Sequence, residues 1–455
     1  MKRNGPLKGL RVVAGSESLL SSAGGSLLTR TASVIGLDRV LSEQLRPWRS
    51  SRASHDPGKI VLDLAATIAL GGDCLSDLAV LRSQPDLFGH VASDPTVSRL
   101  IARLAADAEQ SLPALRAARA SARRRTWQLA PVVPDTGPVV IDIDATLVDA
   151  HSEKEGAQPT FKRGFGFAPI LAFLDHGPGG TGESLAGVLR PGRATANDAA
   201  DHITVLTDAL TQLPEQMRRR VLVRADSGAG SNKFLTHLHS LNLQYSVGLH
   251  GWPTILDALD KVPRQAWKAA LDPDGFPRDG AQVAELTRYV PAPTGMRVWP
   301  AGMRVMARRE RPHPGAQMRI TDRDGWRITV FATNVQGGRI AEHEVLHRLR
   351  ARAEDQIRCL KDTGLRNLPL HDFAGNQIWL ELVGLAADLL TWTQHLSLSG
   401  SPARTWEPKR LRLRLLNIAG RIVRSGRRDW LRLPRGWPWT PTLLAGHDRL
   451  RALSH

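Results

Sequence analysis

The spacing of apolar residues divides the chain into a helical first part and an α/β second part. Over residues 1–130, apolar side chains recur at helical spacing, as in "KIVLDLAATIALGGDCLSDLAVLR". From 137 to 250, short apolar runs rich in β-branched residues predict strands around a helix at about 197–212. We place the strands at 138–144, 168–174, 184–189, 220–225 and 243–248. This succession predicts a mixed α/β sheet.

The pattern changes twice more before the end of the chain. Between 250 and 335, stretches such as "MRVMARRE" and "DGWRITVFATN" lie between Pro- and Gly-rich turns and predict a β-rich insertion. Helical spacing resumes at about 340–363 and 375–398. We therefore expect an all-α N-terminal domain (1–130), an α/β domain in two parts (131–250 and 336–400), the insertion between them (251–335), and a basic, Trp- and Arg-rich helical tail (401–455).

Two aspartates interrupt the first predicted strand, in "GPVVIDIDAT" (137–146). A strand buried in a sheet is usually apolar throughout, yet Asp142 and Asp144 share one face, about 7 Å apart along a regular strand. A third aspartate, Asp226, ends the strand in "RVLVRADSGAGSN". Each aspartate alone also fits an ordinary turn cap. Together they are typical of a site for a hard cation such as Mg²⁺.

A glutamate on a later helix adds to these acids. In "EHEVLHRLRARAEDQIRCLKDTG", the predicted core stripe consists of Leu346, Leu349, Ala353, Ile357 and Leu360. Beside it lie His347, Arg350, Glu354 and Lys361, either as a solvated salt-bridged face or facing a neighbouring element. In the second case Glu354 joins the aspartates. Three carboxylates on two strands and a helix suit phosphoryl transfer with two divalent cations.

The overall charge favours a nucleic-acid partner. The chain carries a formal net charge of +17, which is typical of proteins that bind polyanions. Its two cysteines and the spacing of its histidines predict neither a disulfide framework nor a zinc site. No window has the roughly 18 apolar residues of a membrane span. We therefore expect no membrane partner and a cytoplasmic location.

These residues resemble a known family. Asp144, Asp226 and Glu354 are similar to the DDE triad of insertion-sequence transposases with an RNase H-like catalytic domain. One subgroup has the signature Tyr-x2-Arg-x3-Glu-x6-Lys, which His347, Arg350, Glu354 and Lys361 reproduce with histidine in place of tyrosine. The phrases "DAT", "LRPG" and "ADSG" also match, over roughly residues 60–400. The family's β-rich insertion falls in the gap of 128 residues between Asp226 and Glu354.

The resemblance implies a fold, a reaction and partners. The fold is an RNase H-like mixed sheet with a β-rich insertion, and the reaction is cut-and-paste DNA transposition with two Mg²⁺ (or Mn²⁺) ions. The implied partners are double-stranded DNA with terminal inverted repeats, target DNA and a second copy of the chain, in a bacterial, nucleoid-associated setting. The N-terminal domain, and the tail with it, would recognise the repeats. A nuclease of the same fold and a non-catalytic DNA-binding descendant are the alternatives.

The resemblance also implies roles for individual residues. Asp144, which precedes Ala-Thr, is the implied metal ligand, and Asp142 is an auxiliary or a structural carboxylate. Arg350, Lys361 and His347 would position DNA phosphates. Trp252 is a candidate contact for a flipped base, or simply a packing tryptophan.

Overall fold

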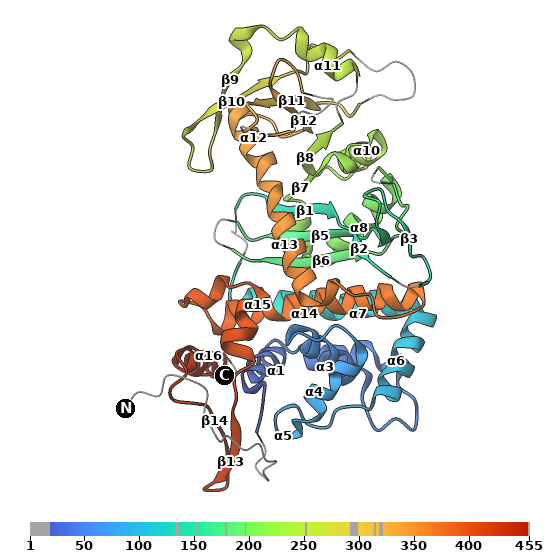
Figure 1. Cartoon of the computed structure of the whole chain (residues 1–455), viewed down its shortest axis with the longest axis vertical. Coiled ribbons are helices and arrows are strands. Elements are labelled where there is room, and N and C mark those ends of the chain that lie inside the picture. The colour runs from blue at the N-terminus through green and yellow to red at the C-terminus, as the bar shows by residue number, and fades with distance from the viewer. Residues whose placement is uncertain are drawn as a thin grey trace.

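A mixed sheet of nine strands forms the centre of the molecule. The computed structural model describes residues 19–132, 136–151, 153–177, 180–195, 197–250, 253–291, 299–313, 315–317 and 322–453. The strand order is β6-β5-β1-β7-β8-β12-β11-β10-β9. Figure 1 shows this sheet above a helical region, with one long helix, α14, between them. This mixed α/β architecture is compatible with the expected RNase H-like fold.

Five of the nine strands correspond to those expected between 138 and 248. They are β1 (Val139–Ala145), β5 (Ile170–Asp175), β6 (Gly182–Val188), β7 (Val221–Ala225) and β8 (Gln244–Leu249). β5 runs antiparallel to β1 and β6, whereas β1, β7 and β8 are parallel. The helices among them are α8 (Ala199–Thr211), α9 (Glu215–Arg218) and α10 (Asn232–Ser240). A small separate sheet contains β2 (Val148–Asp149), β4 (Phe165–Phe167) and β3 (Gln158–Pro159).

The strands of the expected insertion extend the same sheet. This region begins with a helix, α11 (Pro253–Asp260), and its strands are β9 (Lys268–Leu271), β10 (Pro277–Glu285), β11 (Arg304–Glu310) and β12 (Arg327–Thr333). β12 pairs antiparallel with β8. The insertion therefore satisfies backbone groups that β8 would otherwise leave unpaired at an edge. Apolar alternation correctly predicted strands here, but not their union with the main sheet.

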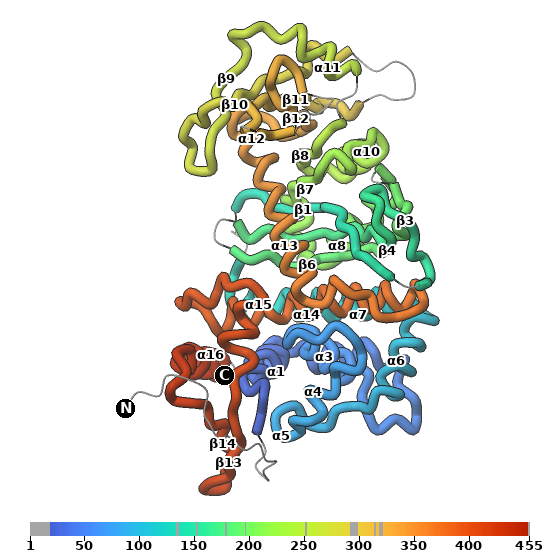
Figure 2. The backbone as a smooth tube through the Cα atoms, in the orientation of Figure 1, coloured from blue at the N-terminus to red at the C-terminus, as the bar shows by residue number. Residues whose placement is uncertain are grey.

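The helical first part shares its core with later segments. Its helices are α1 (Ser26–Val34), α2 (Leu37–Gln44), α3 (Pro57–Ala69), α4 (Ala79–Arg82), α5 (Pro85–Phe88), α6 (Asp94–Ala106) and α7 (Ala108–Leu129). Of these, α1, α3, α6 and α7 pack on α14 (Phe373–Ser397), which is buried on nearly all sides. Figure 2 shows the C-terminal segment in red alongside these first helices in blue. No helix in the described ranges is long and apolar enough to cross a membrane.

Five charged side chains are buried where α7 and α14 meet the sheet. This buried charge core consists of Arg119, Arg123, Glu183, Glu381 and Asp388, each at most 2 % exposed. Arg123 Nε lies 2.6 Å from Glu183 Oε2, and its Nη2 lies 2.5 Å from Asp388 Oδ2. Burial raises the pKa of Glu183, but Arg123 and the other donors outweigh it, so the pKa lies below its usual range. Arg116, at the rim of this group, adds a third positive charge 3.2 Å from Glu381, so that three arginines face the three acids.

The C-terminal region contains a β-hairpin as well as helices. Its helices are α15 (Pro408–Leu411) and α16 (Thr440–Ala452), and its strands are β13 (Arg421–Ser425) and β14 (Arg428–Arg432). The prediction of a helical tail is therefore wrong between Arg421 and Arg432. A two-residue turn with Gly426 in a left-handed conformation reverses the chain there. Ile422 and Val423 add β-branched character to a segment that its arginines made look helical.

Candidate active site

Asp144 and Asp226 lie at the carboxyl ends of two neighbouring parallel strands. The register of β1 and β7 pairs Ile143 with Ala225. The next residue along each chain is an aspartate, so the two aspartates stand at the same level of the sheet. Because hydrogen-bonded strands are about 4.8 Å apart, both acids belong to one edge. The alternation that placed Asp142 and Asp144 on one face of β1 is also confirmed, because Ile141 and Ile143 pack in the opposite core.

The backbone around each aspartate holds it in place. Asp144 Oδ1 accepts a hydrogen bond from the next backbone N–H, at 2.8 Å. Asp226 Oδ1 accepts one from Gly228 N at 2.9 Å and so caps the short turn Ser227–Ala229. This turn lies against Gly248 of β8, where an added Cβ would come within 2.7 Å of Ser227 N. A glycine is therefore needed there for the turn carrying Asp226 to approach the sheet.

Glu354 comes from a helix that crosses the sheet beside β1 and β5. The expected helix at 340–363 is divided into α12 (Ile340–Arg348), a tight 3₁₀ turn (Leu349–Ala351) and α13 (Arg352–Leu360). Figure 1 shows α13 passing in front of the strands, and α13 contacts β1 and β5. Glu354 itself is exposed at the start of α13. The helix thus brings a third carboxylate toward the edge where the aspartates lie.

The charges of Asp226 and Glu354 act on the pKa of Asp144. The pKa of Asp144 is raised to about 7, mainly by burial and then by the carboxylates of Asp226 and Glu354. The hydrogen bond from the next residue and the charge of Arg350 act in the opposite direction without cancelling the shift. Clustered carboxylate oxygens that repel one another are the donor set that divalent cations such as Mg²⁺ bind. We refer to Asp144, Asp226 and Glu354 as the acidic site.

A basic cleft lies next to the acidic site. It has a volume of about 550 Å³ and is lined by Asp226 and by residues from the loop after β1 and the end of α13. Its cationic lining residues are Lys162, Arg163, Arg190 and Lys361. Burial lowers the pKa of Lys361, Lys162 adds to this effect, and Asp149 opposes it. The cleft therefore offers positive charge next to the acids, as phosphate binding requires.

Asp142 lies below the acidic site and is neutralised by an arginine that sequence reasoning overlooked. Arg224 Nε and Nη2 donate to its two carboxylate oxygens at 2.7 and 2.6 Å. Burial raises the pKa of Asp142 to about 6, although Arg224 lowers it. These contacts favour the structural role for Asp142 over the auxiliary one. The sequence did contain a signal for this pair: Arg224 is a charged residue in the apolar run "RVLVRA", and a buried charge requires a partner of opposite charge.

The same arginine begins a chain of ion pairs that reaches α13. Arg224 Nη2 lies 2.7 Å from Asp175 Oδ2, which in turn lies 2.9 Å from Arg352 Nη1. Arg224 Nη1 also donates to the backbone oxygen of Leu346, at 3.4 Å. Arg352 is the first residue of α13, two positions before Glu354. The ion pairs thus tie the helix that carries Glu354 to β1, β5 and β7.

His347 points into the protein interior. Its side chain is 5 % exposed, stacks on Phe331 with ring centroids 4.3 Å apart, and shares a hydrogen bond of 3.0 Å with Ser246. Burial, assisted by Arg350, lowers its pKa to about 3. The phosphate contact of His347 stays a prediction, and the burial of its side chain favours a packing role. The 3₁₀ turn is the reason for this burial, because three residues at 120° instead of 100° rotate the faces by about 60°.

The other predicted residues have different outcomes. Arg350 and Lys361 are half-buried, beside Asp144 and in the basic cleft respectively. Trp252 lies outside the described residues, so its expected contact with a base stays a prediction. The four signature residues therefore do not lie together: His347 is inside the protein, whereas Arg350, Glu354 and Lys361 are in or near the acidic site.

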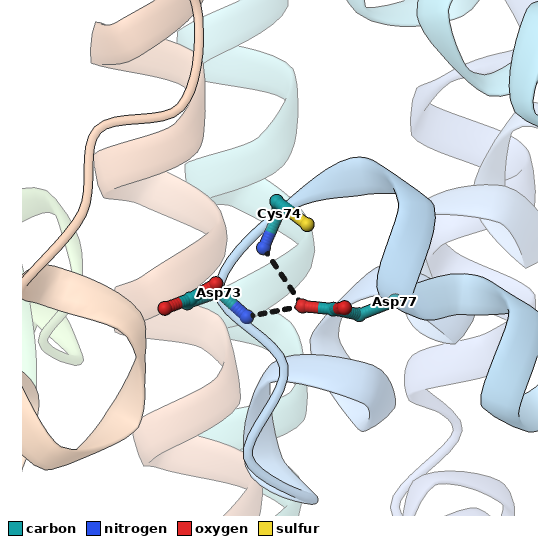
Figure 3. Close-up of side chains that lie close together, drawn as sticks. All are labelled: Asp73, Cys74 and Asp77. Carbon is teal, nitrogen blue, oxygen red and sulfur yellow. Dashed lines mark hydrogen bonds between the residues drawn. The ribbon is translucent and has the colours of Figure 1, made fainter.

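A compact group of possible metal ligands occurs far from the acidic site. In the described part of the chain, the ligand atoms of Asp73, Cys74 and Asp77 all lie within 4.8 Å of one another. Figure 3 shows why: Asp77 Oδ2 accepts hydrogen bonds from the backbone N–H groups of Asp73 and Cys74, at 2.8 and 3.1 Å. This is a helix cap formed by a local turn. The group is therefore explained without a cation.

Comparisons with known proteins place the chain in a family. No curated protein sequence matches it. Among solved structures, a cryo-EM structure of the piggyBac transposase synaptic complex with hairpin DNA is similar, with a TM-score of 0.41 and 10% sequence identity, covering 86% of this chain and 79% of that one. The family described as Transposase DDE domain group 1 matches residues 6–455, nearly the whole chain. The chain belongs to this family and is a DDE transposase, an enzyme of DNA transposition.

Proposed function

We propose that Asp144, Asp226 and Glu354 are the catalytic acids of an insertion-sequence transposase. The observation that carries this assignment is that Asp144 and Asp226 stand at one level of the sheet, at the ends of β1 and β7, with Glu354 near enough to contribute to the raised pKa of Asp144. They lie on two parallel strands and a helix, next to a basic cleft. In the proposed reaction, water attacks the phosphodiester at the transposon end and releases a 3′-hydroxyl. That hydroxyl then attacks the opposite strand or the target DNA.

The acidic site would hold two Mg²⁺ or Mn²⁺ ions. Its donors are carboxylate oxygens, which suit hard cations, and their mutual repulsion is relieved when positive charge enters. Bound cations would polarise the phosphate and neutralise the charge that develops on it.

Cationic side chains around the acids would hold the DNA backbone. Arg350 lies close enough to lower the pKa of Asp144, and Lys361 lines the cleft beside Asp226. Lys162 and Arg163, from the turn between β3 and β4, extend the positive surface. Arginine and lysine bind phosphate oxygens through charge-assisted hydrogen bonds. The scissile phosphate would therefore lie between the acids and the cleft.

The ion pairs beneath the acidic site would position its glutamate. Asp142 and Asp175 hold Arg224 between them, and Arg352 joins Asp175 to α13. Arg224 also contacts the backbone of α12 at Leu346, next to His347, which packs α12 against the sheet. These ion pairs would fix the position of Glu354 relative to Asp144 and Asp226 before DNA binds. Neither Asp142 nor Arg224 contacts DNA in this proposal.

The remaining regions would recognise the DNA ends. A cleft of about 670 Å³ on the N-terminal helices is lined by Arg52, Arg99 and Arg103, with Thr96 at the start of α6. This surface has the charge and polar groups of a DNA-contacting helix. We infer that the N-terminal domain (1–130) binds the terminal inverted repeats. A homodimer would hold two ends together in the cytoplasm, near the nucleoid.

The decisive test uses linear DNA that carries the inverted repeats flanking the gene. Wild-type protein in Mg²⁺ is expected to nick the repeat boundary, whereas EDTA and Glu354→Gln abolish nicking, as resolved on a denaturing gel. Asp355→Asn is a matched control, because Asp355 is the next residue, is exposed, and pairs only with Arg358 among described residues. It should leave the nicking rate within about twofold of wild type.

The outcome also separates the alternatives. Nicking at the boundary without joined products would indicate a nuclease of the same fold. DNA binding without cleavage in Mg²⁺ or Mn²⁺ would contradict the catalytic assignment and leave a non-catalytic DNA-binding descendant.

A further inference from the structure

The C-terminal hairpin β13–β14 stands apart from the rest of the fold. It forms a two-stranded sheet of its own. Its base is fixed by a bridge between Gly420 and Leu20, with backbone hydrogen bonds of 2.8 and 2.9 Å. Figure 1 shows the hairpin projecting beyond the helices at the end of the molecule opposite the insertion. A hairpin of this size is marginally stable alone, so its base anchors it.

The two faces of the hairpin differ. One face contains Ile422 and Leu431, which pack against the helical core. Arg424 and Asp429 form the next cross-strand pair on that face. The outward face carries the other three cross-strand pairs: Arg421 with Arg432, Val423 with Trp430, and Ser425 with Arg428. Trp430 is 52 % exposed. The outward face therefore combines arginines with an accessible aromatic ring.

The arginines of the hairpin have no ion-pair or hydrogen-bond partner for their side chains within the described part of the chain. Residues 421–432 include five exposed arginines and a single acid, Asp429. Among the residues that the structure describes, none forms an ion pair or hydrogen bond with any of the five guanidinium groups. Arg421 and Arg432 even face each other directly, which destabilises a strand pair. An anionic partner would remove this repulsion.

The tip of the hairpin places an arginine where its backbone is unfavourable. The two central residues of the turn, Gly426 and Arg427, have φ angles of +61° and +60°. Both positions of such a turn favour glycine or asparagine, and a larger side chain is strained there. A strained residue at an exposed position is a reason to look for a function. Here the side chain retained at a conformational cost is a further positive charge at the tip.

We propose that the hairpin β13–β14 is a β-ribbon that binds double-stranded DNA, its outward arginines and the tip arginine contacting phosphates. This inference rests on the proposed function only in that the protein acts on duplex DNA. The charge of the face is complementary to the DNA backbone, and the major groove admits a two-stranded ribbon. Each strand of five residues is about 17 Å long, or half a turn of the duplex.

The experiment measures DNA affinity of the full-length protein against salt concentration, by fluorescence anisotropy. The test variant combines Arg421→Gln, Arg428→Gln and Arg432→Gln on the outward face. The control combines Arg39→Gln, Arg339→Gln and Arg451→Gln, three exposed arginines on other elements, and so changes the net charge equally. A separate variant, Arg427→Gly, removes the tip charge and relieves the strained backbone.

The expected result is a smaller salt dependence for the hairpin variants. Each lost phosphate contact lowers the slope of log affinity against log salt by about 0.9. The test variant should lose about 2–3 units of slope and bind roughly 10- to 100-fold more weakly, while the control keeps the wild-type slope. Arg427→Gly should lose about one unit with an unchanged or higher melting temperature. This variant gives an answer even if the triple substitution disturbs folding.

Two outcomes would overturn the proposal. Slopes equal to wild type in both Arg427→Gly and the test variant would show that the hairpin does not contact DNA. Loss of dimers in sedimentation with an unchanged slope would make the face a protein interface instead. Cleavage at saturating protein is measured in parallel. If the wild type binds and cleaves DNA and the hairpin variants have the same affinity and salt dependence, only this inference is refuted. If the wild type never cleaves DNA, the catalytic assignment is refuted.

Discussion

The buried charge core and the acidic site each contain three acidic side chains. The acids of the charge core are paired with arginines, whereas those of the acidic site lie near other acids. In the charge core, Glu183, Glu381 and Asp388 meet three arginines, and indole and backbone N–H groups complete their hydrogen bonds. In the acidic site, Asp144 faces two other carboxylates, and its pKa rises to about 7. Compensated charges tie elements together, whereas uncompensated ones create affinity for a cation.

The largest expected effect comes from removing one acid of the acidic site. Asp144→Asn should lower the rate of DNA nicking by about 10³-fold or more, which corresponds to about 4 kcal/mol of barrier. The folded protein should not suffer, because the substitution removes repulsion from Asp226 and Glu354. Nicking rates and urea unfolding measure the two effects. If Asp144→Asn lowered stability but left nicking intact, Asp144 would have a structural role like that of the acids in the charge core.

Removing an acid from the charge core should act on stability instead. Asp388→Ala leaves Arg119 and Arg123 with a lost partner in a site without solvent. Breaking such a buried pair costs about 3–5 kcal/mol of unfolding free energy. Asp448→Asn serves as the control, because its pair with Arg451 is exposed and should contribute less than about 1 kcal/mol. Equal effects of both substitutions in urea unfolding would contradict the role of the charge core.

Addition of a divalent cation should stabilise only the protein with an intact acidic site. At a Mg²⁺ concentration of 100 times the Kd, binding to the native state contributes about 2.7 kcal/mol. Wild type should therefore melt at a higher temperature in Mg²⁺ than in EDTA, and Asp144→Asn should show little or no shift. An equal shift in both proteins would place the cation elsewhere, with the cap at Asp73 and Asp77 as the first position to examine.

The last predicted effect is confined to acid pH and vanishes near neutrality, and it comes from the neutral His347 beside the acidic site. Its folded pKa of about 3 lies below the ordinary 6.5. The unfolded chain therefore binds the proton first, so stability is lost as pH falls from 6.5 toward 3. The slope is about 1.4 kcal/mol per pH unit for this one group. His347→Phe, which keeps an aromatic ring on Phe331, should reduce the slope of unfolding free energy against pH by that amount.

Much of the secondary structure could be predicted because its signal is local. The run predicted as a strand at 138–144 forms β1 (Val139–Ala145), and the helix predicted at 197–212 forms α8 (Ala199–Thr211). Apolar spacing reports which face of an element is buried, and that needs only neighbouring residues. The hairpin at 421–432 was not predicted, because its many arginines obscured a two-residue turn and a short alternation of apolar and polar residues.

The candidate site could be predicted only in part. The resemblance to the signature located Glu354, and the strand ends located Asp144 and Asp226, which the structure brings together. The partner of Asp142 could not be read from its own strand. Arg224 lies 82 residues away, and only the register of β1 and β7 places the two side by side.

By itself the sequence determined the elements, the three acids and the basic character of the chain. The tertiary structure decided which charges meet: the acids of the buried core with arginines, those of the acidic site with one another. It also decided that the insertion continues the main sheet and that His347 turns inward beside a 3₁₀ turn. The reason is physical, because side-chain spacing is local, whereas strand register and helix rotation are set by contacts between residues far apart in the chain.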